Sequence, residues 1–247
     1  MIPKSIEQED FAKLLVKYGV PAVSTTFGIF DLDITNYLKA NGIKILVNCC
    51  NCAEAKLAAS QGSDALILQG AEAGGHQGSF LTNKPNKLSS LTLLKQIKAL
   101  NLNLPLIAAG GINLSNISAY WEAGANFVQL GTLFMLSNLS LLNAECLHYL
   151  VSQAPHVKTI LTDALTGKWV RSIANPLTHL LSQSNYSFPI QHYATSYLRS
   201  EAKRNDNFDF AGLWLGEHPS YQIFLIEDLL KQLKAAYDEY STKINTR

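Results

Sequence analysis

The sequence predicts an α/β fold built on a parallel sheet, and three observations carry that prediction. Five short, mostly apolar runs recur before residue 139, and each is followed by a segment with helical periodicity. The starts of successive runs lie about 20 to 40 residues apart, which is the length that a βα unit requires. No strand is joined to its neighbour by an Asn-Gly hairpin turn, so nothing indicates an antiparallel pairing of these runs.

The predicted elements begin with a helix at 6–18. That helix places Phe11, Leu14 and Tyr18 on one face, and Gly19 is placed to end it. The strands that follow are predicted at 21–26, 43–48, 62–68, 105–109 and 127–130, and the helices between them at 31–41, 53–60, 88–100 and about 113–123. Asn113 or Ser115 is expected to cap the last of these helices.

Beyond residue 138 the alternation of strands and helices fades. Helices are predicted at 141–153, 176–183, 190–203 and 219–240, with a short edge strand at 159–162 and a loop at 205–220. We therefore expect two parts: residues 1–138, which form the parallel sheet with its helices, and residues 139–247, a helical appendage packed on it.

The composition is that of a globular protein with little net charge. The chain has 247 residues, 47% hydrophobic and 16% charged, and can bury a core. A net charge of +1 argues against nucleic acid and an anionic membrane surface as partners. No apolar run could span a bilayer, and the first residues lack the features of a signal peptide. Four cysteines do not make a disulfide framework at this length, so a cytoplasmic location is expected.

Residues 69–78 (Gln-Gly-Ala-Glu-Ala-Gly-Gly-His-Gln-Gly) are the first candidate for a ligand site. They hold four glycines, one acid and His76 directly after a predicted strand. In α/β proteins, ligands bind where strands end in this way. Gly110-Gly111 and Gly131-Thr132 also follow strands and precede helical segments, where backbone amides can hold a phosphate. Each pair taken alone is more typical of an ordinary helix start, but on a parallel barrel all three strand ends share one face.

These segments resemble the signature segments of nitronate monooxygenases, the FMN-dependent family formerly called 2-nitropropane dioxygenases. The matching segments are 23–28 (Val-Ser-Thr-Thr-Phe-Gly), 69–78, 107–112 (Ile-Ala-Ala-Gly-Gly-Ile) and 129–132 (Gln-Leu-Gly-Thr). Two later segments also fit, 165–175 (Leu-Thr-Gly-Lys-Trp-Val-Arg-Ser-Ile-Ala-Asn) and 212–216 (Gly-Leu-Trp-Leu-Gly). The resemblance covers essentially the whole chain. Segment 69–78 is specific to this superfamily, whereas segment 107–112 is shared with many FMN barrels.

The resemblance implies a TIM barrel that holds FMN at its C-terminal face and oxidises alkyl nitronates with molecular oxygen. It also makes His76 the candidate catalytic residue, facing flavin and substrate. A neutral imidazole there would take the α-proton of a nitroalkane, whereas an imidazolium would stabilise an anionic nitronate. No metal site is expected. The positions implied to bind the cofactor are Gln69, Gly74, Gly110, Gly111, Gln129, Leu130, Gly131 and Thr132.

The chain departs from the family pattern at its start. It begins inside what would be the helix before the fourth barrel strand, so the expected fold is a partial (β/α)8 barrel with strands four to eight. Three βα units, roughly 90 residues at about 30 per unit, have no counterpart here, and the first and fifth strands would have unpaired edges. Three explanations stay open: a fragment complemented by an N-terminal segment, a degenerate product that no longer catalyses, or a half-barrel that forms a homo-oligomer.

A flavin-dependent enoyl-acyl-carrier-protein reductase is the alternative enzyme. Such reductases share the glycine-histidine segment and the strand ends expected at the phosphate. They would need a nicotinamide donor and a long acyl channel. Segments 23–28 and 165–175 favour the monooxygenase.

Several other residues receive mainly structural interpretations. Cys49, Cys50 and Cys52 lack the second ligand pair of a zinc site. Glu72 is expected to be a structural or solvated carboxylate. Asn48 ends a strand on the ligand face, where it either reaches the ligand or packs.

The basic residues of the appendage are also interpreted as structural. Arg171 is expected in a salt bridge, and Arg199, Lys203 and Arg204 on a solvated helix face. The remaining histidines show no common ligand spacing and are assigned no chemistry; they are His148, His156, His179, His192 and His218.

Overall fold

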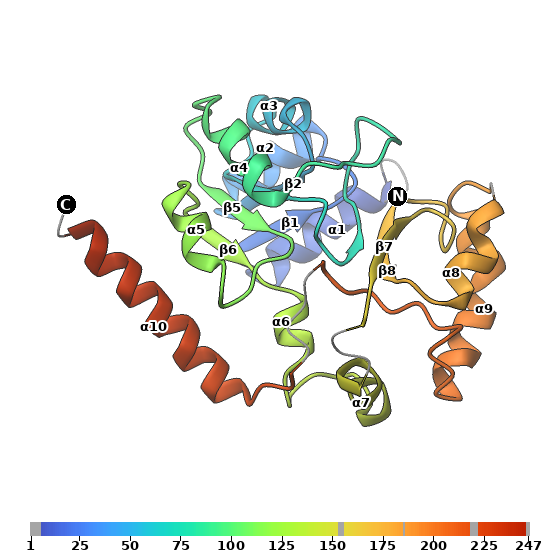
Figure 1. Ribbon diagram of the computed structural model, residues 1–247. Coiled ribbons are helices and arrows are strands. Elements are labelled where there is room, and N and C mark those ends of the chain that lie inside the picture. The colour runs from blue at the N-terminus through green and yellow to red at the C-terminus, as the bar shows by residue number, and fades with distance from the viewer. Residues whose placement is uncertain (1–5, 153–155, 185, 218–221, 246–247) are drawn as a thin grey trace.

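The computed structural model describes residues 6–152, 156–184, 186–217 and 222–245, and its centre is a five-stranded parallel sheet (Figure 1). The strand order is β1-β2-β3-β5-β6, and each neighbouring pair is parallel. The strands are β1 (Ala22–Thr25), β2 (Lys44–Cys49), β3 (Ala65–Gln69), β5 (Leu106–Ala109) and β6 (Phe127–Gln129). The five strands predicted from the apolar runs are therefore confirmed, and their order in space follows their order in the chain.

The helices between these strands cover one face of the sheet. They are α2 (Leu32–Ala40), α3 (Cys52–Ser60), α4 (Ser90–Lys98) and α5 (Ile117–Glu122), and each contacts a strand that it connects. Because side chains alternate along a strand, Leu66 and Leu68 are buried in the hydrophobic core that includes these helices. Ile67 and Gln69, on the same strand, line a cavity on the opposite face. The period of two along β3 thus separates the core from the site.

The sheet does not close. Among the described residues, no strand pairs with the outer edge of β1 or of β6. At the β6 edge, the side chain of Phe127 is 60% exposed. The open partial barrel expected from the sequence is confirmed, including the positions of its two edges.

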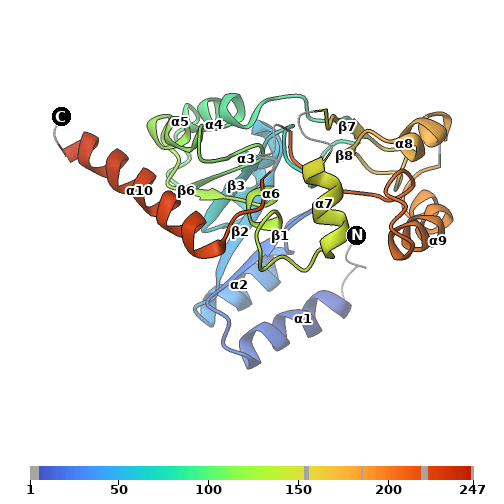
Figure 2. The same ribbon diagram turned by 60° about the horizontal axis from the view of Figure 1, so that its bottom comes forward.

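The first and last helices lie on different sides of the sheet. Helix α1 (Ile6–Lys17) contacts α2, on the β1 side, and α10 (Ile226–Asn245) contacts α5, on the β6 side (Figure 2). The hydroxyl of Tyr240 in α10 donates to the carbonyl of Trp121 at 2.9 Å, and the two rings are 5.4 Å apart. The end of the described chain is thereby attached to the sheet part. The helix predicted at 219–240 begins at Ile226; residues 218–221 lie outside the described residues.

A second, antiparallel sheet joins the two parts that the sequence predicts. It contains β4 (Gly75–His76), β7 (Thr159–Thr162) and β8 (Val170–Ile173) in the order β4-β8-β7. The edge strand at 159–162 was predicted, whereas β4 and β8 were not. Strand β8 is buried along its whole length, so it shows no alternation of polar and apolar residues. Strand β4 has only two residues, and His76 is placed there by its pairing with Val170.

Helices make up most of the rest of the appendage, as predicted. They are α7 (Ala144–Ser152), α8 (Pro176–Leu180), the short 3-10 helix η1 (Leu181–Gln183) and α9 (Ile190–Arg204); the short α6 (Thr132–Met135) precedes them. Helix α8 begins with a capping box, in which the side chain of Asn175 accepts from the amide of Thr178 at 3.1 Å and the Thr178 hydroxyl accepts from the Asn175 amide at 3.0 Å. The division of the chain at residue 138 stays a prediction.

Two local predictions were wrong. Asn116 occupies the N-cap position of α5 without a side-chain hydrogen bond to the helix, and neither Asn113 nor Ser115 occupies that position. Asn113 instead forms a turn before the helix, where its side-chain oxygen accepts from the Ser115 amide at 2.9 Å. Arg199 does not lie on a solvated face, because it is half-buried and its Nε donates to the Thr195 hydroxyl at 3.1 Å. No helix within the described ranges is long and apolar enough to cross a membrane.

Candidate active site

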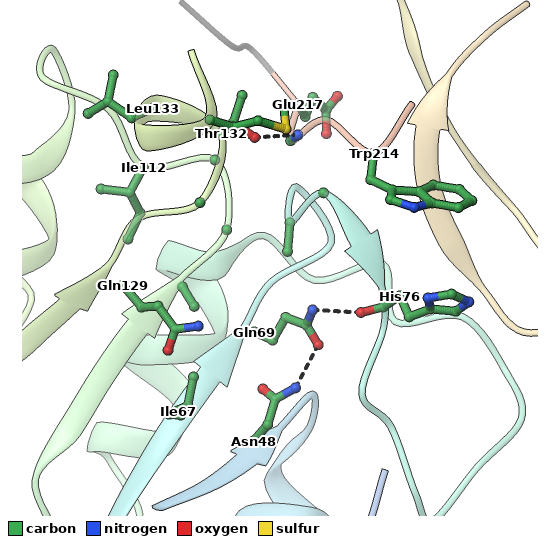
Figure 3. Close-up of a pocket in the computed structure, with 18 of the residues that line it drawn as sticks. Asn48, Ile67, Gln69, His76, Ile112, Gln129, Thr132, Leu133, Trp214 and Glu217 are labelled. Atoms are coloured by element: carbon green, nitrogen blue, oxygen red, sulfur yellow. Dashed lines mark hydrogen bonds between the residues drawn. The ribbon is translucent and has the colours of Figure 1, made fainter. Parts of the chain in front are cut away.

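A cavity of about 450 Å³ lies at the carboxyl ends of the parallel strands (Figure 3). All five strands reach it, directly or through the loops that follow them. Its lining includes Ser24, Thr26, Asn48, Ile67, Gln69, Gly74, His76, Gly110, Gly111, Ile112, Gln129, Gly131, Thr132, Trp214 and Glu217. The strand ends that the sequence expected to share one face therefore do so. A volume of this size is typical of small-molecule and cofactor sites.

The predicted cofactor-binding residues line this cavity with one exception. Gln69, Gly74, Gly110, Gly111, Gln129, Gly131 and Thr132 are all part of the lining. Leu130 is not part of it, because its side chain packs against the hydrophobic core and against the cluster around Leu133. Leu130 can therefore offer only its backbone to a ligand.

The side chain of Gln69 holds the glycine-histidine loop against the sheet. Its Oε1 accepts from the amide of Gly78 at 2.8 Å and from Nδ2 of Asn48 at 3.0 Å. Its Nε2 donates to the carbonyl of His76 at 2.8 Å. One side chain at the end of β3 thus fixes the loop at two points, and His76 is positioned through its own backbone.

Three of the glycines are needed because loops pack closely around the cavity. A Cβ at Gly74 would lie 2.6 Å from the amide nitrogen of Gly216. A Cβ at Gly110, where φ is +106°, would lie 2.9 Å from the nitrogen of Ala73. Gly111, with φ +67°, would place a Cβ 2.7 Å from that of Glu72. These glycines therefore serve the packing of the protein itself.

Gly131 differs from the other glycines of the site. A Cβ there would meet nothing within 4 Å, and its φ of −106° suits any residue. The protein therefore does not require glycine at this position, and the space beside it is open to the cavity. Helix α6 follows directly, and the first amides of a helix have no acceptors within it. Helix α5, by contrast, begins only at Ile117, so Gly110-Gly111 precedes a helical segment, as expected, but residues 112–116 separate it from that helix.

The segment 212–217 of the appendage closes one side of the cavity. The amide of Gly216 donates to the Thr132 hydroxyl at 2.9 Å, and the amide of Glu217 donates to the Glu72 carbonyl at 2.7 Å. Sequence reasoning placed this segment in a loop and did not assign Trp214 or Glu217 to the site. More than 130 residues separate this segment from His76, so local sequence patterns cannot place the two together. The only signal in the sequence was the resemblance of the Gly-Leu-Trp-Leu-Gly segment to the family.

The imidazole of His76 lies between two aromatic rings at the side of the cavity. Its centroid is 6.0 Å from that of Phe27 and 5.8 Å from that of Trp214. The ring points away from Gln69 and lies beneath Trp214 (Figure 3). Its Nε2 is 2.9 Å from the hydroxyl oxygen of Thr166, which is fully buried. Thr166 belongs to the loop before β8, so the appendage supplies the hydrogen-bond partner of this ring.

His76 is neutral at physiological pH. Burial lowers the pKa of the imidazole to about 4, with smaller electrostatic contributions from His192, Lys168 and Arg199. The ammonium of Lys168 lies 4.3 Å from the centroid of the Phe27 ring, beside the same histidine. A neutral ring can accept a proton or a hydrogen bond, whereas the imidazolium considered from the sequence is disfavoured here.

Arg171 and Glu72 support the loop at 69–78, and neither side chain lines the cavity. The Arg171 side chain is 7% exposed; its Nε donates to the carbonyl of Ala71 at 2.7 Å, and it forms the expected ion pair, with Glu217 at 3.5 Å. The carboxylate of Glu72 accepts from the amide of Ser90 at 2.8 Å, at the start of α4. Glu72 therefore has the structural role expected from the sequence.

The cysteines are packed thiols. Cys49 and Cys50 are buried, and burial raises the pKa of Cys50 to about 12, so this thiol is not a nucleophile. Across the described part of the chain, no cluster of three or more His, Cys, Asp or Glu side chains could hold a metal ion.

Comparisons with known proteins show the family of this chain. The family profile described as nitronate monooxygenase matches residues 3–235. A probable nitronate monooxygenase of Staphylococcus saprophyticus is 34% identical over 237 residues, covering 91% of this chain and 66% of that protein. A probable nitronate monooxygenase of Bacillus subtilis is also 34% identical, over 219 residues, covering 85% and 62%. This chain therefore spans somewhat less than two thirds of the length of these relatives.

Solved structures show the same fold. A nitroalkane oxidase from Streptomyces ansochromogenes superposes with a TM-score of 0.85 and 29% identity, covering 96% of this chain and 69% of that one. FabK from Thermotoga maritima superposes with a TM-score of 0.78 but 23% identity, covering 100% and 77%, and this likeness shows the fold alone. Because the family profile covers nearly the whole sequence, the chain belongs to the nitronate monooxygenase family.

Proposed function

We propose that this chain forms the flavin site of an enzyme that oxidises alkyl nitronates with molecular oxygen. The observation that carries the proposal is the cavity at the strand ends, which has a neutral, buried histidine at one side. Family membership supports it, since the family uses FMN. The curated relatives are about half as long again as this chain, so their activity comes to it only as a proposal.

The residues around the cavity fit FMN. Gly131 leaves open space beside the first amides of α6, which suits a phosphate, although a four-residue helix contributes little dipole. At the other side, Oδ1 of Asn48 is buried without a hydrogen-bond partner among the described residues, as expected of an acceptor that a ligand satisfies. Gln69, Gln129 and Thr132 line the space between these two points.

In this proposal His76 acts as the base. FMN, when bound, accepts the electrons of the substrate and passes them to oxygen. The neutral imidazole would take the α-proton of a nitroalkane through the ring nitrogen that does not face Thr166. Phe27 and Trp214 flank the ring and keep it dehydrated, which maintains the neutral form. With a nitronate already ionised there is no α-proton to remove, and the reaction would not need His76 as a base.

Reconstitution with FMN tests the proposal. The purified protein should retain FMN after gel filtration, show flavin absorbance, and consume oxygen with propyl nitronate. His76→Gln should keep FMN and lose most of the activity with neutral nitroalkane, because glutamine cannot accept the proton. Exposed His148 provides a control, and His148→Gln should behave like wild type. A protein that binds no FMN would exclude the proposed site, and NADH oxidation with crotonyl thioester would favour the reductase.

A second candidate role, that of an oligomerising half-barrel, is favoured by the open edges of β1 and β6. Unpaired strand edges, here with exposed Phe127, are surfaces that other chains can cover. Light scattering during size-exclusion chromatography would distinguish the two roles. A monomer that binds FMN and consumes oxygen argues against this second role, whereas a flavin-free oligomer argues for it.

A further inference from the structure

Asn48 carries an acceptor that no described residue of the protein uses. Its side chain lies at the end of β2, is 6% exposed and lines the cavity. Its Nδ2 donates to Oε1 of Gln69 at 3.0 Å. Its Oδ1 is buried and has no hydrogen-bond partner within the described part of the chain. Buried acceptors are nearly always paired in folded proteins, so this atom calls for a donor from outside.

The hydrogen bonds around Gln69 fix which way the Asn48 amide points. The backbone amide of Gly78 can only donate, so the Gln69 atom 2.8 Å from it must be the oxygen. The other end of Gln69 donates to the carbonyl of His76, which agrees with this assignment. Asn48 must then present its NH2 group to the Gln69 oxygen, because a reversed amide would set two oxygens against each other. Its own oxygen therefore points away from Gln69, on the side of Ile67 and Gln129 (Figure 3).

The missing partner must be an N–H or O–H donor. Alkyl nitronates and molecular oxygen have neither group, so the substrates of the proposed reaction cannot satisfy this atom. FMN has donors of two kinds, which are the ring N3–H and the hydroxyls and phosphate of its side chain. The choice between them depends on how far Asn48 lies from the amides proposed for the phosphate.

The strand order places Asn48 far from those amides. Strand β2 is two positions from β5 and three from β6. Neighbouring strands are about 4.8 Å apart, so Asn48 lies on the order of 14 Å along the sheet from Gly131, where the phosphate is proposed. If the phosphate is held at those amides, the ring end of the flavin is the part that extends to β2.

We propose that Oδ1 of Asn48 accepts a hydrogen bond from the ring N3–H of the flavin, and that Asn48 is thereby a cofactor-binding residue of this chain. The inference rests on the proposed function, since it needs flavin in the cavity. Asn48 then connects the cofactor, through Gln69, to the loop that carries His76.

A double-mutant cycle with modified flavins tests the contact. Binding of lumiflavin and of 3-methyllumiflavin, which lacks the N3–H, is measured by fluorescence titration on wild type and Asn48→Ala. Loss of one such hydrogen bond should weaken binding about tenfold. Methylation of N3 should therefore lower the flavin affinity of wild type about tenfold and change that of Asn48→Ala little. Equal losses in both proteins would overturn the inference.

Two further measurements keep the test decisive. Thr25→Val is the matched control, because Thr25 also has a buried hydroxyl without a partner in the described chain but does not line the cavity. It should bind both flavins like wild type. If Asn48→Ala does not fold, the wild-type comparison decides alone, and equal affinity for the two flavins overturns the inference. A wild type that binds FMN without this coupling refutes only the role of Asn48, whereas one that binds no flavin refutes the proposed function as well.

Discussion

The hydroxyl oxygen of Thr166 lies 2.9 Å from Nε2 of His76, although the two residues are 90 positions apart in the chain. The same oxygen is 3.2 Å from the carbonyl of Lys168, which can only accept. Thr166 therefore donates to Lys168 and accepts from Nε2–H of the imidazole. This arrangement leaves Nδ1 of His76 with the free lone pair, and we expect that nitrogen to receive the proton.

Thr166→Val removes the acceptor for Nε2–H while keeping the shape of the side chain. We expect kcat/KM with a neutral nitroalkane to fall roughly tenfold or more, because the ring loses both its orientation and its tautomer preference. Steady-state oxygen uptake measures this effect. Thr166→Ser retains the hydroxyl and should stay within about twofold of wild type. FMN affinity should be the same in all three proteins, and unchanged kinetics in Thr166→Val would contradict the assignment.

The low pKa of His76 makes stability depend on pH. The ring has a pKa of about 4 when folded and an ordinary value of 6.5, so below pH 6.5 the unfolded chain binds a proton that the folded chain does not. The free energy of unfolding should therefore fall as the pH is lowered from 6.5 towards 4. Urea unfolding of wild type and His76→Gln isolates this contribution, since other groups titrate alike in both. Wild type should lose more stability over that interval, and parallel losses would contradict the low pKa.

Gly74 and Gly131 should respond in opposite ways to substitution by alanine. Gly74→Ala forces a methyl against the backbone of Leu215 and Gly216, and should destabilise the fold by about 1–3 kcal/mol. Gly131→Ala meets open space, so its stability should change by less than about 0.5 kcal/mol. Its methyl would enter the proposed phosphate site, however, and FMN binding should weaken. Thermal unfolding and flavin titration measure the two effects, and a Gly131→Ala protein with normal FMN affinity would move the phosphate elsewhere.

The buried Arg171 should contribute far more to stability than an exposed arginine such as Arg204. Arg171→Ala leaves the carbonyl of Ala71 without its donor and removes the ion pair with Glu217, and should cost roughly 2–4 kcal/mol. Arg204 makes an ion pair with Glu201 at the exposed end of α9, and Arg204→Ala should change stability by less than about 1 kcal/mol. Urea unfolding compares the two. Similar losses in both variants would show that the buried arginine does not hold the glycine-histidine loop.

The sheet and its helices could be predicted because their signals are local. The run Ala-Leu-Ile-Leu at 65–68 is apolar on both faces, as a buried parallel strand requires, and it became β3. Helix ends at glycines, such as Gly42 with φ +77°, could be predicted for the same reason. The cap of α5 was misplaced because Asn113, Ser115 and Asn116 all suit a helix start. The sequence alone cannot decide which of three such residues occupies the N-cap position.

The sequence by itself determined the five parallel strands, the strand ends that carry the glycines, and the family to which the chain belongs. Those properties follow from apolar periodicity, glycine placement and motif, which are read within a few residues of each other. Only the tertiary structure decided that His76 is neutral, that Thr166 is its partner, and that Oδ1 of Asn48 has no partner among the described residues. Each of these depends on burial and on contacts between residues from about 20 to 90 positions apart, set by how the appendage and the sheet pack together.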